Sequence, residues 1–174
     1  MNRSDSLDQA TLAAALAQPE DQPRAGFAAL RALANEAGVA KIFTVLAFDL
    51  TRRQSLRVFT SDALLYPPDV VAELVDTLWE RTLLGKKQPL VLNDFAALSS
   101  LLPEAGQLRE RGCEAMLNVP VVVAGEVIGA LNMLHDSGRY DAVHVEAARA
   151  LVPGAAALLL WRRAKTTGAR RPEA

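Results

Sequence analysis

Residues 113–135, CEAMLNVPVVVAGEVIGALNMLH, carry the strongest structural signal in the chain. Two long apolar runs in this stretch flank a short turn at Ala124 and Gly125, which is the pattern of a β-hairpin. A two-residue turn would need a positive φ at Ala124, which its Cβ resists, so we expect a three-residue loop with Gly125 in the left-handed conformation. Because both strands are apolar throughout, protein must cover both faces of their sheet.

The expected loop sets the pairing of the hairpin and therefore the face on which each side chain lies. It pairs Val122 with Glu126, Asn118 with Ala130, Met116 with Asn132, and Cys113 with His135. Asn118 and Asn132 then lie diagonally on one face, among Met116, Ile128, Ala130 and Leu134. The opposite face carries apolar side chains, and we expect the terminal helices to cover it: Leu117, Val119, Val121 and Leu131.

Helical and strand periodicities alternate along the rest of the chain. Apolar stripes predict two helices in the first forty residues, one with Leu7, Leu12 and Leu16 and one with Phe27, Leu30, Leu33 and Ala34. The runs KIFTVLAFD (41–49) and SLRVFTS (55–61) predict a strand hairpin, and PLVLND (89–94) predicts a short strand. Further helices are expected over 67–84, with Val71, Leu74 and Leu78 buried, over 103–111, and over 142–165 with a kink at Pro153.

Composition bounds the kind of protein. With 174 residues, 51% hydrophobic residues and a formal charge of -1, the chain suits one globular domain and lacks the basic excess of a nucleic-acid-binding protein. The single cysteine, Cys113, excludes an internal disulfide and fits a reducing compartment. The longest apolar run, 150–161, is shorter than the about 20 residues of a membrane span. We therefore expect a cytoplasmic protein with no membrane partner.

The order of these elements predicts an α+β domain built on an antiparallel sheet of five to six strands. We expect terminal helices on one face, and a helix plus a lid loop over the other. Residues 25–165 are expected to form this domain, residues 1–24 a helical segment that is partly mobile, and residues 166–174 a disordered basic tail.

Three stretches in this order resemble the GAF domain family: RGCEAMLNVPVVVAGEVIGALNML (111–134), YDAVHVEAARALVPGAAALLL (140–160), and PLVLNDF (89–95) with its Asp94. The resemblance implies a profilin- or PAS-like architecture and a sensory domain that binds a small molecule. It also implies a homodimer through the terminal helices. The chain lacks the NKFDE signature of cyclic-nucleotide-binding members, and nothing places Cys113 at a bilin attachment point, so we expect no covalent chromophore.

Ligand contacts are expected on the face that carries the two amides. An unpaired buried polar group costs about 1–3 kcal/mol, so these amides bind either a ligand or each other and the nearby loop. Thr44, on the first strand, is a third polar candidate, and the apolar lining would come from Met116, Ala130 and Leu134. In the loop over this face, Gln107 and Arg111 either reach inward, with Arg111 suited to an anion, or stay in solvent.

Cys113 and His135 are the only catalytic candidates, because the expected register brings them together. Such a pair could lower the thiol pKa, or it could be an ordinary half-buried thiol beside a surface imidazole. His135, Asp136, Asp141 and His144 are close in sequence but lack metal-ligand spacing, so no metal site is expected.

The apolar run AAALLLW (155–161) favours packing of the last helix against a second copy. The leading hypothesis is therefore a small-molecule sensor with an unknown ligand that acts as a helical homodimer and passes its signal to a separate protein. The alternatives are a thiol-dependent reductase of the free methionine-R-sulfoxide reductase type that uses Cys113, and a dimerisation platform that binds nothing.

Overall fold

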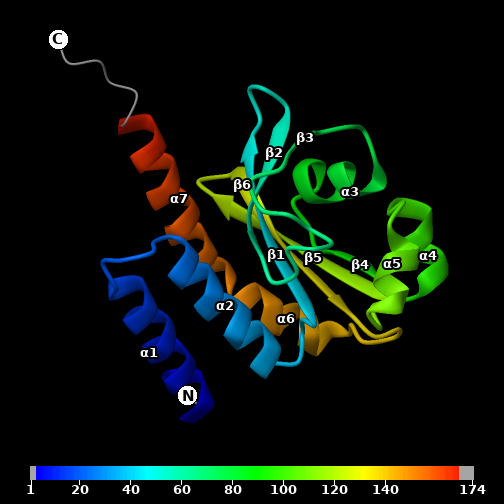
Figure 1. Ribbon diagram of the computed structural model, residues 1–174, viewed down its shortest axis with the longest axis horizontal. Coiled ribbons are helices and arrows are strands. Elements are labelled where there is room, and N and C mark those ends of the chain that lie inside the picture. Colours follow the sequence, from blue (N-terminus) through cyan, green and yellow to red (C-terminus); the bar gives the residue numbers. More distant parts are fainter. Residues whose placement is uncertain (1–2, 169–174) are drawn as a thin grey trace.

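The computed structural model describes residues 3–168, which form one antiparallel sheet with helices on both faces (Figure 1). The six strands lie in the order β3-β2-β1-β6-β5-β4. Their bounds are β1 (Ile42–Asp49), β2 (Gln54–Thr60), β3 (Val71–Glu73), β4 (Leu90–Leu92), β5 (Ala115–Val123) and β6 (Glu126–His135). The α+β class and the antiparallel sheet predicted from the sequence are confirmed.

Three helices cover one face of the sheet: α2 (Arg24–Glu36), α6 (Ala142–Ala150) and α7 (Val152–Gly168) (Figure 1). Helix α1 (Arg3–Ala17) packs on the outer side of α2. The predicted stripe of α2 is buried against β1 and α7, and α2 ends before Gly38, whose φ is 66°. Leu117, Val119, Val121 and Leu131 point into this helical side, as expected. This side of the sheet holds the larger of the two apolar cores.

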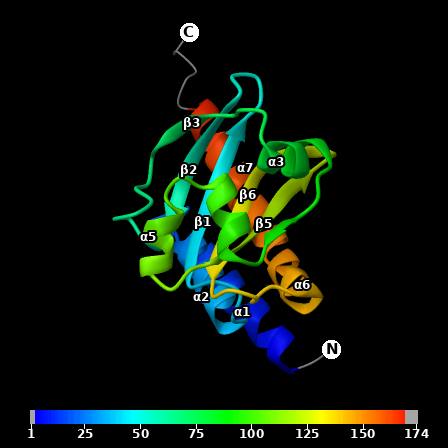
Figure 2. The ribbon, with the colours of Figure 1, turned by 90° about the vertical axis from the view of Figure 1, so that its right-hand side faces the viewer.

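The other face carries shorter elements: α3 (Leu78–Glu80), the π-helical turn η1 (Arg81–Gly85), α4 (Phe95–Leu101) and α5 (Ala105–Glu110) (Figure 2). Asp94 begins α4, because its carboxylate accepts a hydrogen bond from the Ala97 amide over 2.8 Å. A smaller apolar core lies beneath these helices: Ile42, Leu83, Leu90, Leu98, Ala105, Leu108, Cys113, Met116, Ala130 and Leu134. The candidate site lies beside this second core.

The β5–β6 hairpin differs from its predicted register. Ala124 and Gly125 both have positive φ, 49° and 81°, and form a two-residue turn between Val123 and Glu126. A bulge follows, because Val122 pairs with Val127 but Val121 pairs with Gly129. Asn118 consequently faces Asn132, Met116 faces Leu134, and Ala115 rather than Cys113 faces His135. Ile128, the extra residue of the bulge, joins the helical side of the core instead of the amide face.

The helix predicted over 67–84 is wrong. Asp69 has a φ of 60°, and the chain then pairs as the edge strand β3 with β2, through Leu56 and Val71. A left-handed residue cannot continue an α-helix, and Val70 and Val71 favour an extended chain. Of the predicted buried stripe only Leu74 is buried, while Val71 and Leu78 are about half exposed.

The C-terminal helical segment kinks at Leu151, between α6 and α7, next to the Pro153 named from the sequence. Taken together, Ala142–Thr166 contains an 18-residue stretch with a mean hydropathy of 1.4 and is long and apolar enough to cross a membrane. Its apolar side packs on the core through Ala148, Leu151, Ala155, Leu158 and Leu159, and a third of its most apolar 18-residue stretch is buried. The predicted tail begins inside α7, and its residues 169–174, like the side chain of Leu7, lie outside the described part of the chain.

Candidate ligand-binding site

A row of three polar side chains crosses the sheet on its second face. Thr44 of β1, Asn132 of β6 and Asn118 of β5 are direct partners in the strand register. The Asn118 amide Nδ2 donates to Asn132 Oδ1 over 2.7 Å, and Asn132 Nδ2 donates to Thr44 Oγ1 over 3.1 Å. Asn118 is 1% exposed, and its Oδ1 has no hydrogen-bond partner. The two amides are hydrogen-bonded to each other, but Asn118 Oδ1 remains a buried acceptor without a donor.

A hollow of about 250 Å³ opens above this row. Five of the residues predicted to contact a ligand line it: Thr44, Met116, Asn118, Asn132 and Leu134. Ala130 is fully buried in the core beside the hollow and does not line it. The sheet contributes the floor, while the loops between β2 and β4 and the α4–α5 segment contribute the walls. The remaining lining residues are Leu46, Arg57, Tyr66, Thr77, Trp79, Leu101, Leu102 and Glu104.

One wall carries a chain of polar contacts that the sequence analysis missed. The Arg57 guanidinium lies 4.8 Å from the centre of the Tyr66 ring and donates to the Pro67 carbonyl over 3.0 Å. The Tyr66 hydroxyl donates to Glu104 Oε1 over 2.9 Å. Burial lowers the pKa of Arg57, although Tyr66 and Glu104 act in the opposite direction. Burial also raises the pKa of Tyr66, with Glu104 adding to the effect, so the phenol stays protonated.

The second wall is aromatic. Trp79 meets Phe48 edge to face, with ring centres 5.8 Å apart. The Thr77 hydroxyl accepts from the Glu80 amide over 3.2 Å and begins α3, which carries Trp79. Arg53, at the end of the β1–β2 hairpin, holds α3 by donating to Glu80 Oε1 over 2.6 Å. The sequence analysis missed Trp79 because it predicts one long helix over 67–84 with Val71, Leu74 and Leu78 on its buried side, whereas Trp79 lies in the short helix α3.

Gln107 and Arg111 do not reach the hollow. Gln107 is exposed on α5, and Arg111 Nε pairs with Asp62 Oδ2 over 2.8 Å. The pKa of Asp62 is lowered by the Leu65 backbone amide and by Arg111. Arg111 is therefore already paired with a carboxylate of the protein and does not bind a ligand anion in the hollow. The arginine that lines the hollow is Arg57.

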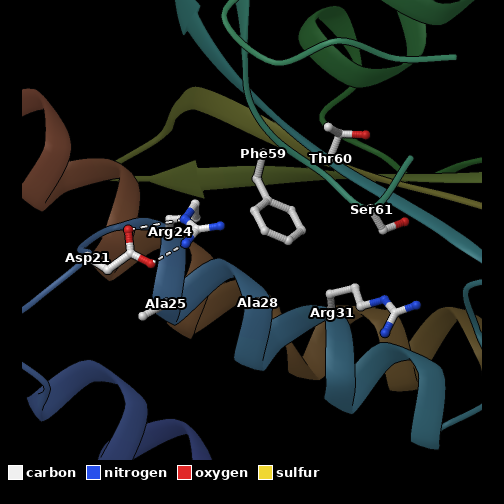
Figure 3. A pocket seen from close by; sticks show the side chains of 8 residues that line it. All are labelled: Asp21, Arg24, Ala25, Ala28, Arg31, Phe59, Thr60 and Ser61. Atoms are coloured by element: carbon white, nitrogen blue, oxygen red, sulfur yellow. Dashed lines mark hydrogen bonds and ion pairs between the residues drawn. The ribbon is translucent and has the colours of Figure 1, made fainter. Parts of the chain in front are cut away.

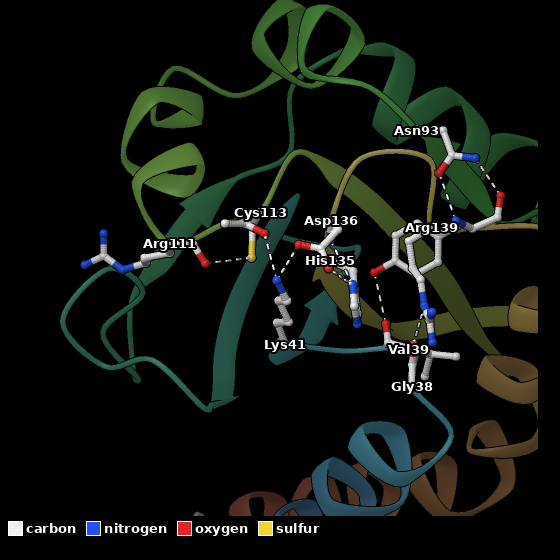
Figure 4. A network of polar contacts seen from close by, with 11 residues as sticks. Gly38, Val39, Lys41, Asn93, Arg111, Cys113, His135, Asp136 and Arg139 are labelled. Atoms are coloured by element: carbon white, nitrogen blue, oxygen red, sulfur yellow. Dashed lines mark hydrogen bonds and ion pairs between the residues drawn. The ribbon is translucent and has the colours of Figure 1, made fainter.

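Cys113 and His135 do not form a catalytic pair (Figure 4). Cys113 is fully buried, its thiol faces the Arg111 carbonyl at 3.9 Å, and burial raises its pKa to about 11. His135 Nδ1 accepts from the Asp136 amide over 2.8 Å, and desolvation together with Arg139 lowers the pKa of the imidazole. Neither group is poised for proton transfer to the other, because the bulge moved the register.

A second, larger hollow of about 520 Å³ lies on the helical side, between α2 and the end of β2 (Figure 3). Its charged residues are exposed, and Arg24 is already paired with Asp21 at 2.7 Å. Phe59 and Ser61 form its inner edge, but the Ser61 hydroxyl accepts from the Phe43 amide. This surface is open to solvent, and no buried polar atom without a partner is found among its described lining residues, unlike in the amide row.

Within residues 3–168 no cluster of three His, Cys, Asp or Glu side chains could hold a metal ion. Of the four residues considered from the sequence, His144 contacts Asp141 over 2.6 Å at the start of α6, and His135 contacts Asp136. Both are local pairs at the ends of elements.

The fold and the position of the hollow can now be compared with known proteins. The family model described as GAF domain matches residues 27–159. The chain belongs to the GAF domain family. The match spans the sheet, the helices α4, α5 and α6 and the first half of α7, and it confirms the resemblance seen in the hairpin and in the segments that flank it.

Solved GAF domains share the fold across low sequence identity. The GAF domain from a phosphoenolpyruvate-protein phosphotransferase (ptsP) of Coxiella burnetii is 18% identical, with a TM-score of 0.69 over 93% of this chain and 95% of that one. The corresponding Acinetobacter GAF domain is 12% identical, with a TM-score of 0.67 over 94% and 97%. A phycocyanobilin-bound GAF domain from a cyanobacterial phytochrome is 13% identical, with a TM-score of 0.66 over 95% and 98%. No curated protein matches the chain.

Proposed function

We propose that this GAF domain is a small-molecule sensor whose ligand binds in the hollow above Thr44, Asn132 and Asn118. The observation that carries the proposal is the unpartnered Asn118 Oδ1, which is buried and belongs to a residue that lines an open hollow. A buried acceptor without a donor costs about 1–3 kcal/mol, and a ligand that donates to it recovers that energy. The family supports the same reading, since one relative is a bilin-bound GAF domain.

The size and lining of the hollow bound the ligand. Its volume of about 250 Å³ lies just below the roughly 300–1,000 Å³ of drug-sized sites. Apolar side chains make up much of the wall, with Arg57, Glu104 and the amide row as the polar points. We therefore propose a metabolite-sized organic molecule with an apolar body.

The sheet offers a direct route from the hollow to the helices. Met116 and Asn118 face the hollow from β5, whereas Leu117 and Val119, between and after them, lie in the core under α6 and α7. A ligand that shifts β5 or β6 therefore shifts the support of α7. On the outer side of α7, Leu160 and Trp161 are each 42% exposed. We propose that this surface joins two copies in the cytoplasm, and that the dimer reports to a separate protein.

Native mass spectrometry of the protein purified gently from its source cells tests the sensor proposal. We expect a bound small molecule, which is absent from a Leu102→Trp variant that fills the hollow from the lid. Leu64→Trp, at a side chain that is 93% exposed, is the matched control. If the unaltered protein has a bare mass, and no member of a metabolite set changes its spectrum, the proposal fails and the dimerisation platform is favoured.

The thiol-reductase alternative has less support. A reductase needs a thiolate, but the Cys113 thiol is buried and its raised pKa keeps it protonated at neutral pH. The rate at which iodoacetamide labels Cys113 across a range of pH decides between the sensor and the thiol reductase.

A further inference from the structure

We infer that the ligand of this site is a small monocarboxylate that carries a hydroxyl group at the end away from its carboxylate. The inference rests on the proposed function and adds the chemistry of the ligand. Its two anchors are Arg57, which takes the carboxylate, and Asn118, which takes the hydroxyl.

Asn118 defines the polar neutral end. The terminal member of the row has a spare hydrogen-bonding group because its strand neighbour β4 presents Leu90, which cannot pair with it. A hydroxyl group both donates and accepts, so it satisfies the Asn118 amide whichever of its two polar atoms faces the hollow. A charged ammonium is disfavoured, because Asn118 and Asn132 are neutral and the nearest apolar walls, Met116 and Leu134, cannot solvate a charge.

Arg57 defines the charged end. In the part of the chain that the structure describes, no carboxylate forms an ion pair with it, and its contacts are the Tyr66 ring and the Pro67 carbonyl. The attraction of Glu104 does not offset the cost of burying the guanidinium, as the lowered pKa of Arg57 shows. A second negative group beside Arg57 would offset the remaining cost of burying its guanidinium.

Glu104 limits that group to one negative charge. Its Oε1 accepts from the Tyr66 hydroxyl, so this carboxylate lies on the same wall as Arg57. A phosphate dianion at the guanidinium would meet the Glu104 charge at short range in a half-buried setting, where repulsion is poorly screened. A carboxylate carries half that charge and still makes two hydrogen bonds to a guanidinium.

The sheet sets the distance between the two anchors. Arg57 is on β2 and Asn118 on β5, with β1 and β6 between them. Arg57 pairs through Leu46 and Ala130 with Pro120, which lies two residues along β5 from Asn118. The two anchors therefore lie obliquely across three strand spacings of about 4.8 Å, which suits a ligand with its carboxylate and hydroxyl at opposite ends of an extended chain. Leu46, Trp79 and Leu102 provide the apolar wall along this path.

The two tryptophans of the chain allow a test with an internal control. Trp79 lines the hollow, whereas Trp161 is exposed on α7, across the sheet. The indole N–H resonances are followed by NMR while 6-hydroxyhexanoate, hexanoate or 6-hydroxyhexanamide is added. We expect 6-hydroxyhexanoate to move the Trp79 resonance and not that of Trp161. Hexanoate lacks the hydroxyl and the amide lacks the charge, so each should bind at least about tenfold more weakly than 6-hydroxyhexanoate.

Variants then assign the two ends. In Arg57→Gln the acid and the amide should bind equally, while Arg31→Gln, an exposed arginine of α2 on the other side of the sheet, should keep the difference. Asn118→Leu should remove the advantage of 6-hydroxyhexanoate over hexanoate. If either variant fails to fold, the comparison of the three probes on the unaltered chain still decides.

The failures of the two proposals are distinguishable. If the amide binds as tightly as the acid, or if only amines or uncharged fragments of a wider set move Trp79, the monocarboxylate inference is overturned and the sensor proposal stands. If no fragment of any charge moves Trp79, both are overturned.

Discussion

Asn118 and Asn132 face each other directly across β5 and β6, and the amide of the first donates to the amide of the second over 2.7 Å. Asn132 is the central member of the row, because it also donates to Thr44. Asn132→Ala therefore leaves both neighbours short of a partner, and we expect a loss of about 1–3 kcal/mol of unfolding free energy. Urea unfolding measures it. Thr44→Val removes only the end of the row and should lower the unfolding free energy by less than Asn132→Ala does. An equal or larger loss would contradict the central position of Asn132 in the row.

Gly129 allows three segments to meet. A Cβ at this position would lie 2.3 Å from the Leu46 carbonyl oxygen and 2.7 Å from Leu159 Cδ1. Because the first of these is backbone, Gly129→Ala must displace β1 from β6, and we expect a loss of about 1–3 kcal/mol in thermal or urea unfolding. Gly106→Ala is the control: it lies in α5 with nothing within 4 Å, and should gain about 0.5–1 kcal/mol. Similar effects of the two substitutions would contradict the close approach.

The Cys113 thiol should make the fold less stable in alkali. Its pKa is about 11 in the folded protein, against an ordinary value near 9, so the unfolded chain loses this proton first as the pH rises. The unfolding free energy should therefore fall between pH 9 and pH 11, by up to about 2 kcal/mol from this group. Tyr66 and Tyr140, whose pKa values are also raised by burial, add to the fall. Urea unfolding across this range should show a shallower slope for Cys113→Ala than for the unaltered chain.

Iodoacetamide labelling gives the same thiol a kinetic test. At neutral pH the folded protein should react far more slowly than the urea-unfolded chain, because the thiol is both buried and protonated. Fast labelling of the folded protein with an apparent pKa below about 8.5 would instead favour the reductase alternative.

The proposed dimer surface predicts a change of mass in solution. Leu160→Glu places a charge on the outer side of α7, beside the exposed Trp161, and we expect light scattering to show the 18.7 kDa monomer in place of a species of twice that mass. Leu64→Glu, in the exposed loop after β2, should leave the dimer intact. A monomeric unaltered chain at micromolar concentration would contradict this role of α7.

The hairpin shows why a wrong turn could still give the right faces. Avoiding a positive φ at Ala124 made the expected loop one residue too long, and sequence periodicity gave no sign of the bulge after Val121. Each error shifts the pairing by one residue, and together they shift it by two, which preserves the side on which Asn118 and Asn132 lie. The predicted partners of Asn118, Met116 and Cys113 were all two residues out of register, whereas among the side chains assigned to a face only Ile128 was misplaced.

Helix and strand periodicity predicted the elements that pack on a continuous apolar face, such as α2 and the four longest strands. It could not predict the segment after β2, because an edge strand of three residues and a helix of three residues are too short to show a period. Tyr66 and Trp79 belong to that segment, so the aromatic wall and part of the polar wall of the hollow were missed. Arg57 lies inside the predicted strand β2 and had one available signal, a cation between the apolar Leu56 and Val58.

Adjacent residues of β5 belong to different halves of the molecule: Met116 and Asn118 to the hollow, Leu117 and Val119 to the helical core. The side chains of the hollow and those of the larger core are therefore separate sets on one shared backbone. Directed evolution of the first set could retune this chain into a biosensor for other small acids without rebuilding its scaffold.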